Sequence, residues 1–138
     1  MDELIALFPT PLLRAPAVLG APLVDGLIRH FATQAICDNN SSSRLSHTEM
    51  LKPGDSPLFV EAARLITPKL VDFGAQMFGE RIGWSLKEMW VNVLEPGGHQ
   101  AMHNHANSFI SGVVYLTATH PGSQTVFMKS PGGNDYLF

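Results

Sequence analysis

Two histidines separated by one residue are the side chains best suited to chemistry in this sequence. His103 and His105 lie in the last third of the chain. On an extended backbone, residues i and i+2 point to the same side, so both imidazoles can reach one metal ion. Imidazole binds Fe(II), Zn(II), Cu and Ni, so the ligands by themselves do not select the metal. Surface histidines also produce this pattern, and the neighbouring segments therefore decide its meaning.

The segments on either side of the pair are predicted to be strands. Glu88–Leu94 is rich in strand formers and ends at Pro96-Gly97-Gly98. Phe109–Thr117 is predicted as a second strand, covered on both faces, and Thr125–Met128 as a third, after a turn at 120–123. In a jelly-roll barrel, two metal ligands leave the end of one strand and a third comes from a later strand.

Two hydroxyl groups follow the histidines on the predicted second strand. Ser111 and Tyr115 have the same parity, so both share one face of that strand. They can bind a carboxylate near the metal. They can equally be interior residues that satisfy each other or a backbone group.

The first half of the chain is predicted to be helical. Residues 22–36 form one helix, whose apolar face includes His30. A longer helix starts at Asp55-Ser56-Pro57, where a polar cap precedes proline, and stops at Gly79. Thr67-Pro68 either kinks this helix or separates it from a second one.

Helices followed by consecutive strands predict an α+β protein with a mainly antiparallel sheet or barrel. We expect one domain over residues 1–138, with a mainly helical part at 1–83 and strands at 84–138. The polar stretch Asn39–Ser43 predicts a loop, with low order through Ser46. The apolar run Leu4–Phe8 predicts a strand or an extended arm.

Composition excludes several classes of protein. The net charge is −3 and no Lys/Arg cluster occurs, so nucleic acid is not an expected partner. Cys37 is the single cysteine, which excludes an internal disulfide. No apolar run reaches the roughly 18 residues of a membrane span, and the N-terminus is acidic where a signal peptide would be basic. A cytoplasmic domain without membrane contact is therefore expected.

The stretch from Trp90 to Leu116 resembles a group of 2-oxoglutarate- and Fe(II)-dependent oxygenases of bacteria and phages. In that group a tryptophan-bearing strand, a Pro-Gly-Gly turn, a His-x-His and a Ser-Gly-Val-x-Tyr-Leu strand come in this order, as they do here. The resemblance is good over residues 88–128 and loose elsewhere, including Leu-Phe-Pro-Thr-Pro at 7–11. It implies N-terminal helices packed on a partial double-stranded β-helix, or jelly-roll barrel. It also implies decarboxylation of 2-oxoglutarate to succinate coupled to hydroxylation of a second substrate, an unidentified small molecule or peptide.

The resemblance assigns roles to five residues. His103 matches the first metal ligand of the family's His-x-Asp/Glu pattern. His105 occupies the carboxylate position, and its imidazole removes a negative charge that should help to hold Fe(II). Asn92, Ser111 and Tyr115 are placed like side chains that contact the oxoacid. No catalytic residue beyond the metal ligands is implied.

The sequence departs from the family after the histidine pair. The family's third metal ligand and its oxoacid-binding arginine lie on later strands, but here only His120 and Lys129 follow, and no arginine follows Arg81. His99 is a spare ligand or a solvated loop residue. The resemblance thus implies a C-terminally truncated, inactive form, whose open sheet edge could pair in a homodimer.

Two other hypotheses remain open. Gly97 followed by five residues and His103-x-His105 meets the opening of a cupin motif, but Phe109 or Ile110 stands where the cupin glutamate is expected. Alternatively, the chain is a non-catalytic barrel fragment that uses the histidines only structurally.

Overall fold

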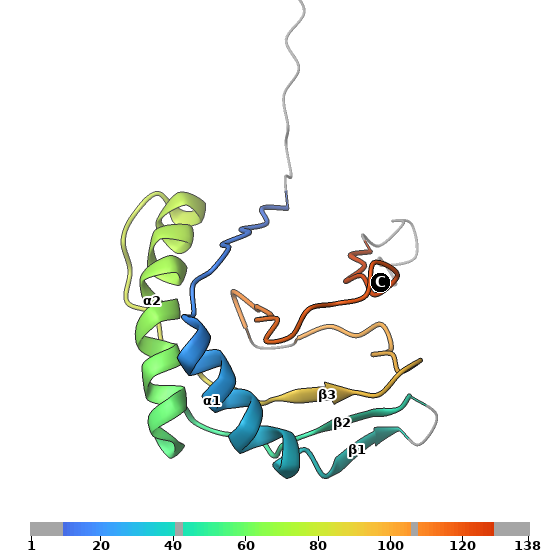
Figure 1. The fold of residues 1–138 in the computed structure, drawn as a ribbon. Helices are drawn as coiled ribbons and strands as arrows, with labels where there is room; N and C mark the ends of the chain where they lie inside the picture. The colour runs from blue at the N-terminus through green and yellow to red at the C-terminus, as the bar shows by residue number, and fades with distance from the viewer. Residues whose placement is uncertain (1–9, 41–42, 106–107, 129–138) are drawn as a thin grey trace, which may run out of the picture.

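Two helices lie beside a three-stranded antiparallel sheet in the computed structural model, which describes residues 10–40, 43–105 and 108–128 (Figure 1). The expected α+β class is confirmed. The segment Leu4–Phe8 and Lys129 lie outside the described residues. In chain order, the elements are α1 (Ala21–Phe31), the 3-10 turn η1 (Ala32–Gln34), β1 (Cys37–Asn40), β2 (Leu45–His47), the 3-10 turn η2 (Pro53–Asp55), α2 (Pro57–Phe78) and β3 (Asn92–Leu94).

Helix α1 begins one residue before the predicted start, with Pro22 in its first turn. A proline is tolerated there because its missing N–H would have no partner within the helix. Leu27 and Phe31 are buried, but His30 is exposed, so its placement on the apolar face was wrong. The helix tightens into η1 after Phe31 and ends before the predicted Ile36.

Helix α2 has the predicted boundaries. The Ser56 side chain accepts a hydrogen bond from Leu58 N at 3.2 Å, which satisfies one free N–H of the first turn. Gly79 ends the helix in a left-handed conformation, φ 78°. Pro68 lies inside one continuous helix, so the prediction of a separate second helix is wrong. Thr67 donates its hydroxyl proton to the carbonyl of Ala63, one turn earlier, at 2.7 Å.

The loop predicted at Asn39–Ser43 is wrong for Asn39 and Asn40, which belong to strand β1, whereas Ser43 lies in a turn before β2. Strand β1 pairs with β2, with Cys37 opposite His47. Strand β2 also pairs with β3, with Ser46 opposite Val93. Leu45 and Ser43 are buried in this hairpin. A single buried leucine among polar residues is too weak a pattern to predict a strand.

The core connects the two helices to the segment that leads into β3. Phe31 of α1 stacks on Phe59 of α2 with ring centroids 4.5 Å apart, beside Leu27 and Ala62. Several partly buried side chains pack against this cluster, among them Leu51, Met89, Val91 and Leu116. Among the described residues, no helix is long and apolar enough to cross a membrane.

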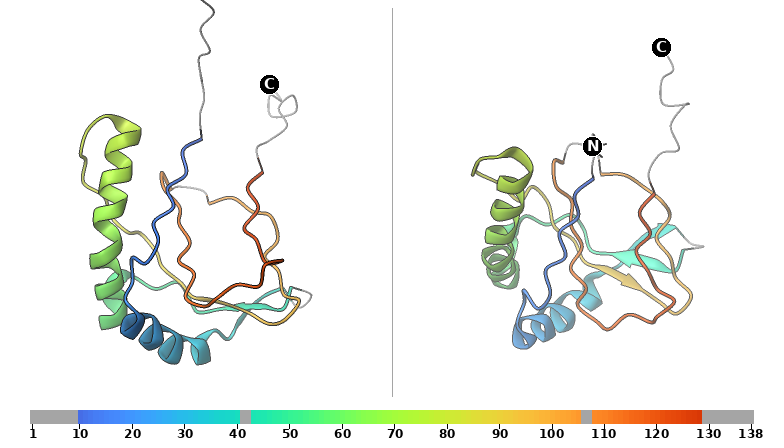
Figure 2. Two further views of the ribbon diagram at one scale, coloured as in Figure 1. Left: turned by 45° about the horizontal axis from the view of Figure 1, so that its top comes forward. Right: turned by 90° about the horizontal axis from the view of Figure 1, so that it is seen from above.

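The strands predicted at Phe109–Thr117 and Thr125–Met128 are not formed. Residues 108–128 contain no regular strand, and Figures 1 and 2 show this segment as a coil that folds back over the sheet. Phe109 and Val113, expected to be covered, are 83% and 69% exposed. Strand formers adopt a strand when a neighbour pairs with them, and the described residues provide none here. A jelly-roll barrel is therefore not shown. The turn predicted at 120–123 is present, closed by Ser123 N donating to His120 O at 2.7 Å.

Candidate metal centre

The glycine turn that leads to the histidines is fixed to the tip of the β1–β2 hairpin. His99 N donates to Ser43 O at 2.8 Å. Gly97 has a φ of 79°, which favours glycine. At Gly98 a Cβ would lie 2.6 Å from Arg44 O, so only glycine allows this close approach. The chain therefore leaves β3 in a direction set by backbone contacts with the hairpin.

The two histidines of the pair converge on each other. Their Nε2 atoms lie 3.1 Å apart, and their ring centroids are 4.8 Å apart at an interplanar angle of 70°. Both side chains are exposed. The geometry agrees with the expectation that the imidazoles lie on one side and close enough to share an ion.

One of the two rings is also held in a defined tautomer. His103 Nδ1 lies 2.9 Å from Ala101 O, and a carbonyl oxygen can only accept, so this nitrogen carries the proton and donates it. In the neutral ring, the Nε2 lone pair of His103 is then directed toward His105. Metal-binding histidines commonly have their other nitrogen held in this way.

The spacing of the nitrogens fits two adjacent ligands of one metal ion. Metal–nitrogen bonds of about 2.0–2.1 Å at a right angle place the nitrogens about 3.0 Å apart. Imidazole nitrogens are suitable donors for Fe(II). Across residues 10–40, 43–105 and 108–128, no group of three or more His, Cys, Asp or Glu side chains is arranged to hold a metal. The described donor set is thus the histidine pair.

The ring of Trp90 contacts this pair. Its centroid lies 5.7 Å from that of His105, at an interplanar angle of 32°. The tryptophan is half-buried. The ring of His105 therefore contacts both the ring of His103 and the indole of Trp90.

Comparison with known proteins finds one family model that matches this part of the chain. Residues 88–136 match the family described as Putative 2OG-Fe(II) oxygenase. The resemblance expected from the sequence motifs is thereby confirmed. The matched segment includes Trp90, His103 and His105. Neither the curated proteins nor the solved structures gave a significant match.

The three side chains proposed to contact the oxoacid also lie in the matched segment. Asn92 lies in β3 and is exposed, as is Ser111. Tyr115 is 58% exposed, and its hydroxyl is hydrogen-bonded to that of Thr125. Among the described residues, no hydrogen bond or ring contact links these three side chains to the pair. Their role stays a prediction.

The two other histidines between positions 99 and 120, His99 and His120, each make a hydrogen bond at a turn. The backbone of His99 anchors the glycine turn, and its side chain is exposed. His120 Nδ1 accepts a hydrogen bond from Gly122 N at 3.0 Å. Neither is gathered with the pair.

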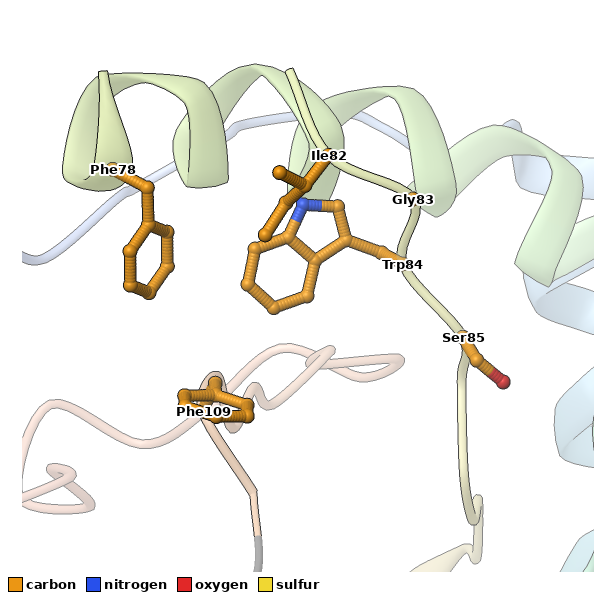
Figure 3. Close-up of a pocket in the computed structure, with 6 residues that line it drawn as sticks. All are labelled: Phe78, Ile82, Gly83, Trp84, Ser85 and Phe109. Carbon is orange, nitrogen blue, oxygen red and sulfur yellow. The ribbon is translucent and has the colours of Figure 1, made fainter. Parts of the chain in front are cut away.

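An apolar pocket of about 320 Å³ was not predicted from the sequence (Figure 3). The ring centroids of Phe78 and Trp84 lie 5.8 Å apart, and those of Phe109 and Trp84 lie 6.5 Å apart. Trp84 packs over Gly74, where a Cβ would meet its ring at 2.5 Å. The one signal in the sequence that could have indicated this pocket is the close spacing of Phe78 and Trp84 near the end of α2. The pocket is lined by Phe78, Ile82, Gly83, Trp84, Ser85 and Phe109.

Proposed function

We propose that this chain carries the His-x-His part of the non-haem Fe(II) centre of a 2-oxoglutarate-dependent oxygenase of the hydroxylase type. The 3.1 Å separation of the His103 and His105 Nε2 atoms, inside the segment that matches the oxygenase family, supports this proposal most strongly. The jelly-roll barrel of such enzymes is part of the same proposal.

In this proposal His103 and His105 hold the iron. The Ala101 carbonyl keeps the proton of His103 on Nδ1, so that Nε2 is ready to bind. When bound, Fe(II) and 2-oxoglutarate supply the oxygen activation and the decarboxylation to succinate. His105 contributes no charge, so the pair attracts the cation less than a histidine and a carboxylate would.

The oxoacid is proposed to be held by Asn92, Ser111 and Tyr115. A hydroxyl or amide donates a hydrogen bond to a carboxylate oxygen. Tyr115 must first give up its hydrogen bond to Thr125, or donate to the ligand while it accepts from that hydroxyl. The second substrate is proposed to be a small molecule or a peptide.

Anaerobic titration with Fe(II) and 2-oxoglutarate tests the metal centre. We expect a visible charge-transfer band for the wild-type chain. His103→Ala and His105→Ala should abolish it, because each removes one of the two convergent nitrogens. Asn104→Ala is the matched control, since Asn104 is exposed and lies between the ligands. A band that survives in both histidine variants would contradict the assignment.

A succinate assay with Fe(II), ascorbate and 2-oxoglutarate tests catalysis. The expectation from the sequence is that succinate stays at the level of the His103→Ala control, because a centre of this class uses three protein ligands. Succinate clearly above that control would show that a third ligand completes the site. Metal binding without succinate would favour the non-catalytic alternative.

A further inference from the structure

The backbone of Trp90 is held on both sides by the segment that follows β2. Met89 and Leu51 exchange two hydrogen bonds, each 2.8 Å long. Thr48 N donates to Val91 O at 3.0 Å, and Val91 N donates to the Thr48 hydroxyl oxygen at 3.1 Å. Four hydrogen bonds therefore flank this one residue, and Thr48 itself is buried.

The direction of the indole follows from this anchoring. Met89 and Val91 both pack on the hydrophobic core. Successive side chains of an extended backbone point to opposite faces, so Trp90 points away from the core. On that side its ring lies 5.7 Å from the ring of His105.

His105 itself lies in a segment without helix or strand, residues 95–105. Its described ring contacts are with His103 and Trp90. Of these two neighbours, Trp90 is the one whose backbone is tied to the folded core.

We infer that Trp90 is the positioning residue of the metal centre: its indole limits the rotation of the His105 ring and keeps Nε2 directed toward Nε2 of His103. The inference rests on the proposed metal centre. A ring that is already oriented loses less conformational freedom when it binds a ligand, so the indole should raise metal affinity without touching the metal.

Intrinsic fluorescence gives a direct test, because Trp84 and Trp90 are the two tryptophans of the chain. In Trp84→Phe, Trp90 is the only tryptophan, so emission excited at a wavelength that tyrosine does not absorb comes from Trp90 alone. Ni²⁺ bound by the histidine pair would lie next to it. We expect saturable quenching by Ni²⁺ in this variant and none in Trp84→Phe combined with His103→Ala. A Trp84→Phe protein that binds Ni²⁺ by calorimetry without quenching would overturn the inference.

Calorimetric titration with Ni²⁺ then measures the positioning effect. Trp90→Ala and Trp90→Leu should weaken binding about 10–100-fold, the usual effect of removing a group that orients a ligand. Trp90→Phe keeps a flat ring and should restore most of the affinity. Thermal unfolding by circular dichroism identifies any variant that fails to fold. The Ni²⁺ affinities of the folded variants then test whether Trp90 positions His105.

Two results separate this inference from the function on which it rests. If wild type and folded Trp90→Leu bind Ni²⁺ equally tightly, Trp90 is not a positioning residue, while the metal centre stands. If wild type binds no Ni²⁺ at all, the metal centre itself is refuted, and the inference with it.

Discussion

The two histidines of the pair differ in how the protein holds them. His103 has a hydrogen bond from Nδ1 to a backbone carbonyl, whereas His105 is held by side chains, through its Nε2 at 3.1 Å from Nε2 of His103 and through the ring of Trp90. Both are exposed, so water reaches the nitrogens and competes with any ligand. An oxygenase centre works best where water is excluded, because reactive species are then protected from side reactions. We therefore expect the bound oxoacid and second substrate to cover these residues.

Tyr115 provides a test at the level of one hydroxyl group. If it donates to a carboxylate of the oxoacid, Tyr115→Phe should weaken 2-oxoglutarate binding about 12–160-fold, which corresponds to about 1.5–3 kcal/mol for one hydrogen bond to a charged group. The affinity for the metal alone should not change. Calorimetry with Ni²⁺, followed by 2-oxoglutarate, measures both affinities in one preparation.

Thr125→Val is the matched control for Tyr115→Phe, because it breaks the same hydrogen bond from the other side. It leaves the tyrosine hydroxyl free for the oxoacid, so 2-oxoglutarate should bind at least as tightly as to wild type. If both variants lower the unfolding temperature equally and neither changes oxoacid affinity, the two hydroxyls form a purely structural pair.

Among the elements, the junction between the hairpin and the glycine turn sets the path of the chain from β3 to the histidines. The site for a side chain at Gly98 is closed by backbone oxygens, at 2.6 Å from Arg44 and 2.9 Å from Glu95. Backbone atoms cannot move aside as a flexible side chain can. The turn therefore tolerates no larger residue without displacing the hairpin.

Gly98→Ala should lower the free energy of unfolding by about 1–3 kcal/mol, the usual cost of forcing an extra methyl group into a packed site. It should also weaken Ni²⁺ binding, because the displaced turn carries the chain toward His103. Gly54→Ala is the control, since nothing lies within 4 Å of a Cβ there, and its effect should stay under about 0.5 kcal/mol. Urea denaturation measures the free energy of unfolding of both variants. Equal stability of the two variants would show that the turn adjusts freely.

The comparison of elements shows what the sequence can predict. The start and end of α2 follow from Ser56, Pro57 and Gly79, which act through local backbone chemistry. The β1–β2 hairpin was missed because Leu45 is its one strongly buried apolar residue. Phe109–Thr117 was wrongly predicted as a strand because strand propensity is realised only through pairing with a neighbour.

The site shows the same division between local and tertiary information. The convergence of His103 and His105 followed from their spacing alone. The contact between Trp90 and His105 did not, because it depends on the turn that brings residues 15 positions apart together. The pocket around Trp84 likewise depends on a tertiary contact, between the end of α2 and Phe109.

In the molecule as a whole, buried and exposed apolar residues lie in different places. The buried cluster joins α1 and α2. The segment 109–128 is rich in exposed apolar side chains, and Leu116 is its contact with that cluster. Exposed apolar surface that is concentrated in one segment usually marks an interaction site. The most exposed large apolar side chains of this segment are Phe109, Val113, Val126, Phe127 and Met128.

We propose that a second copy of the chain covers this segment through its exposed apolar side chains, in place of the predicted pairing at an open sheet edge, because the strands of that edge are not formed here. Sedimentation or light scattering over a range of concentrations should show a dimer. Val126→Lys combined with Phe127→Lys should shift it to monomer, since burying two charges in an apolar contact is strongly unfavourable. Ile36→Lys should leave the dimer intact, because Ile36, although 81% exposed, lies outside the segment 109–128. A wild-type chain that stays monomeric at every concentration, or an equal effect of Ile36→Lys, would show that residues 109–128 do not form the interface.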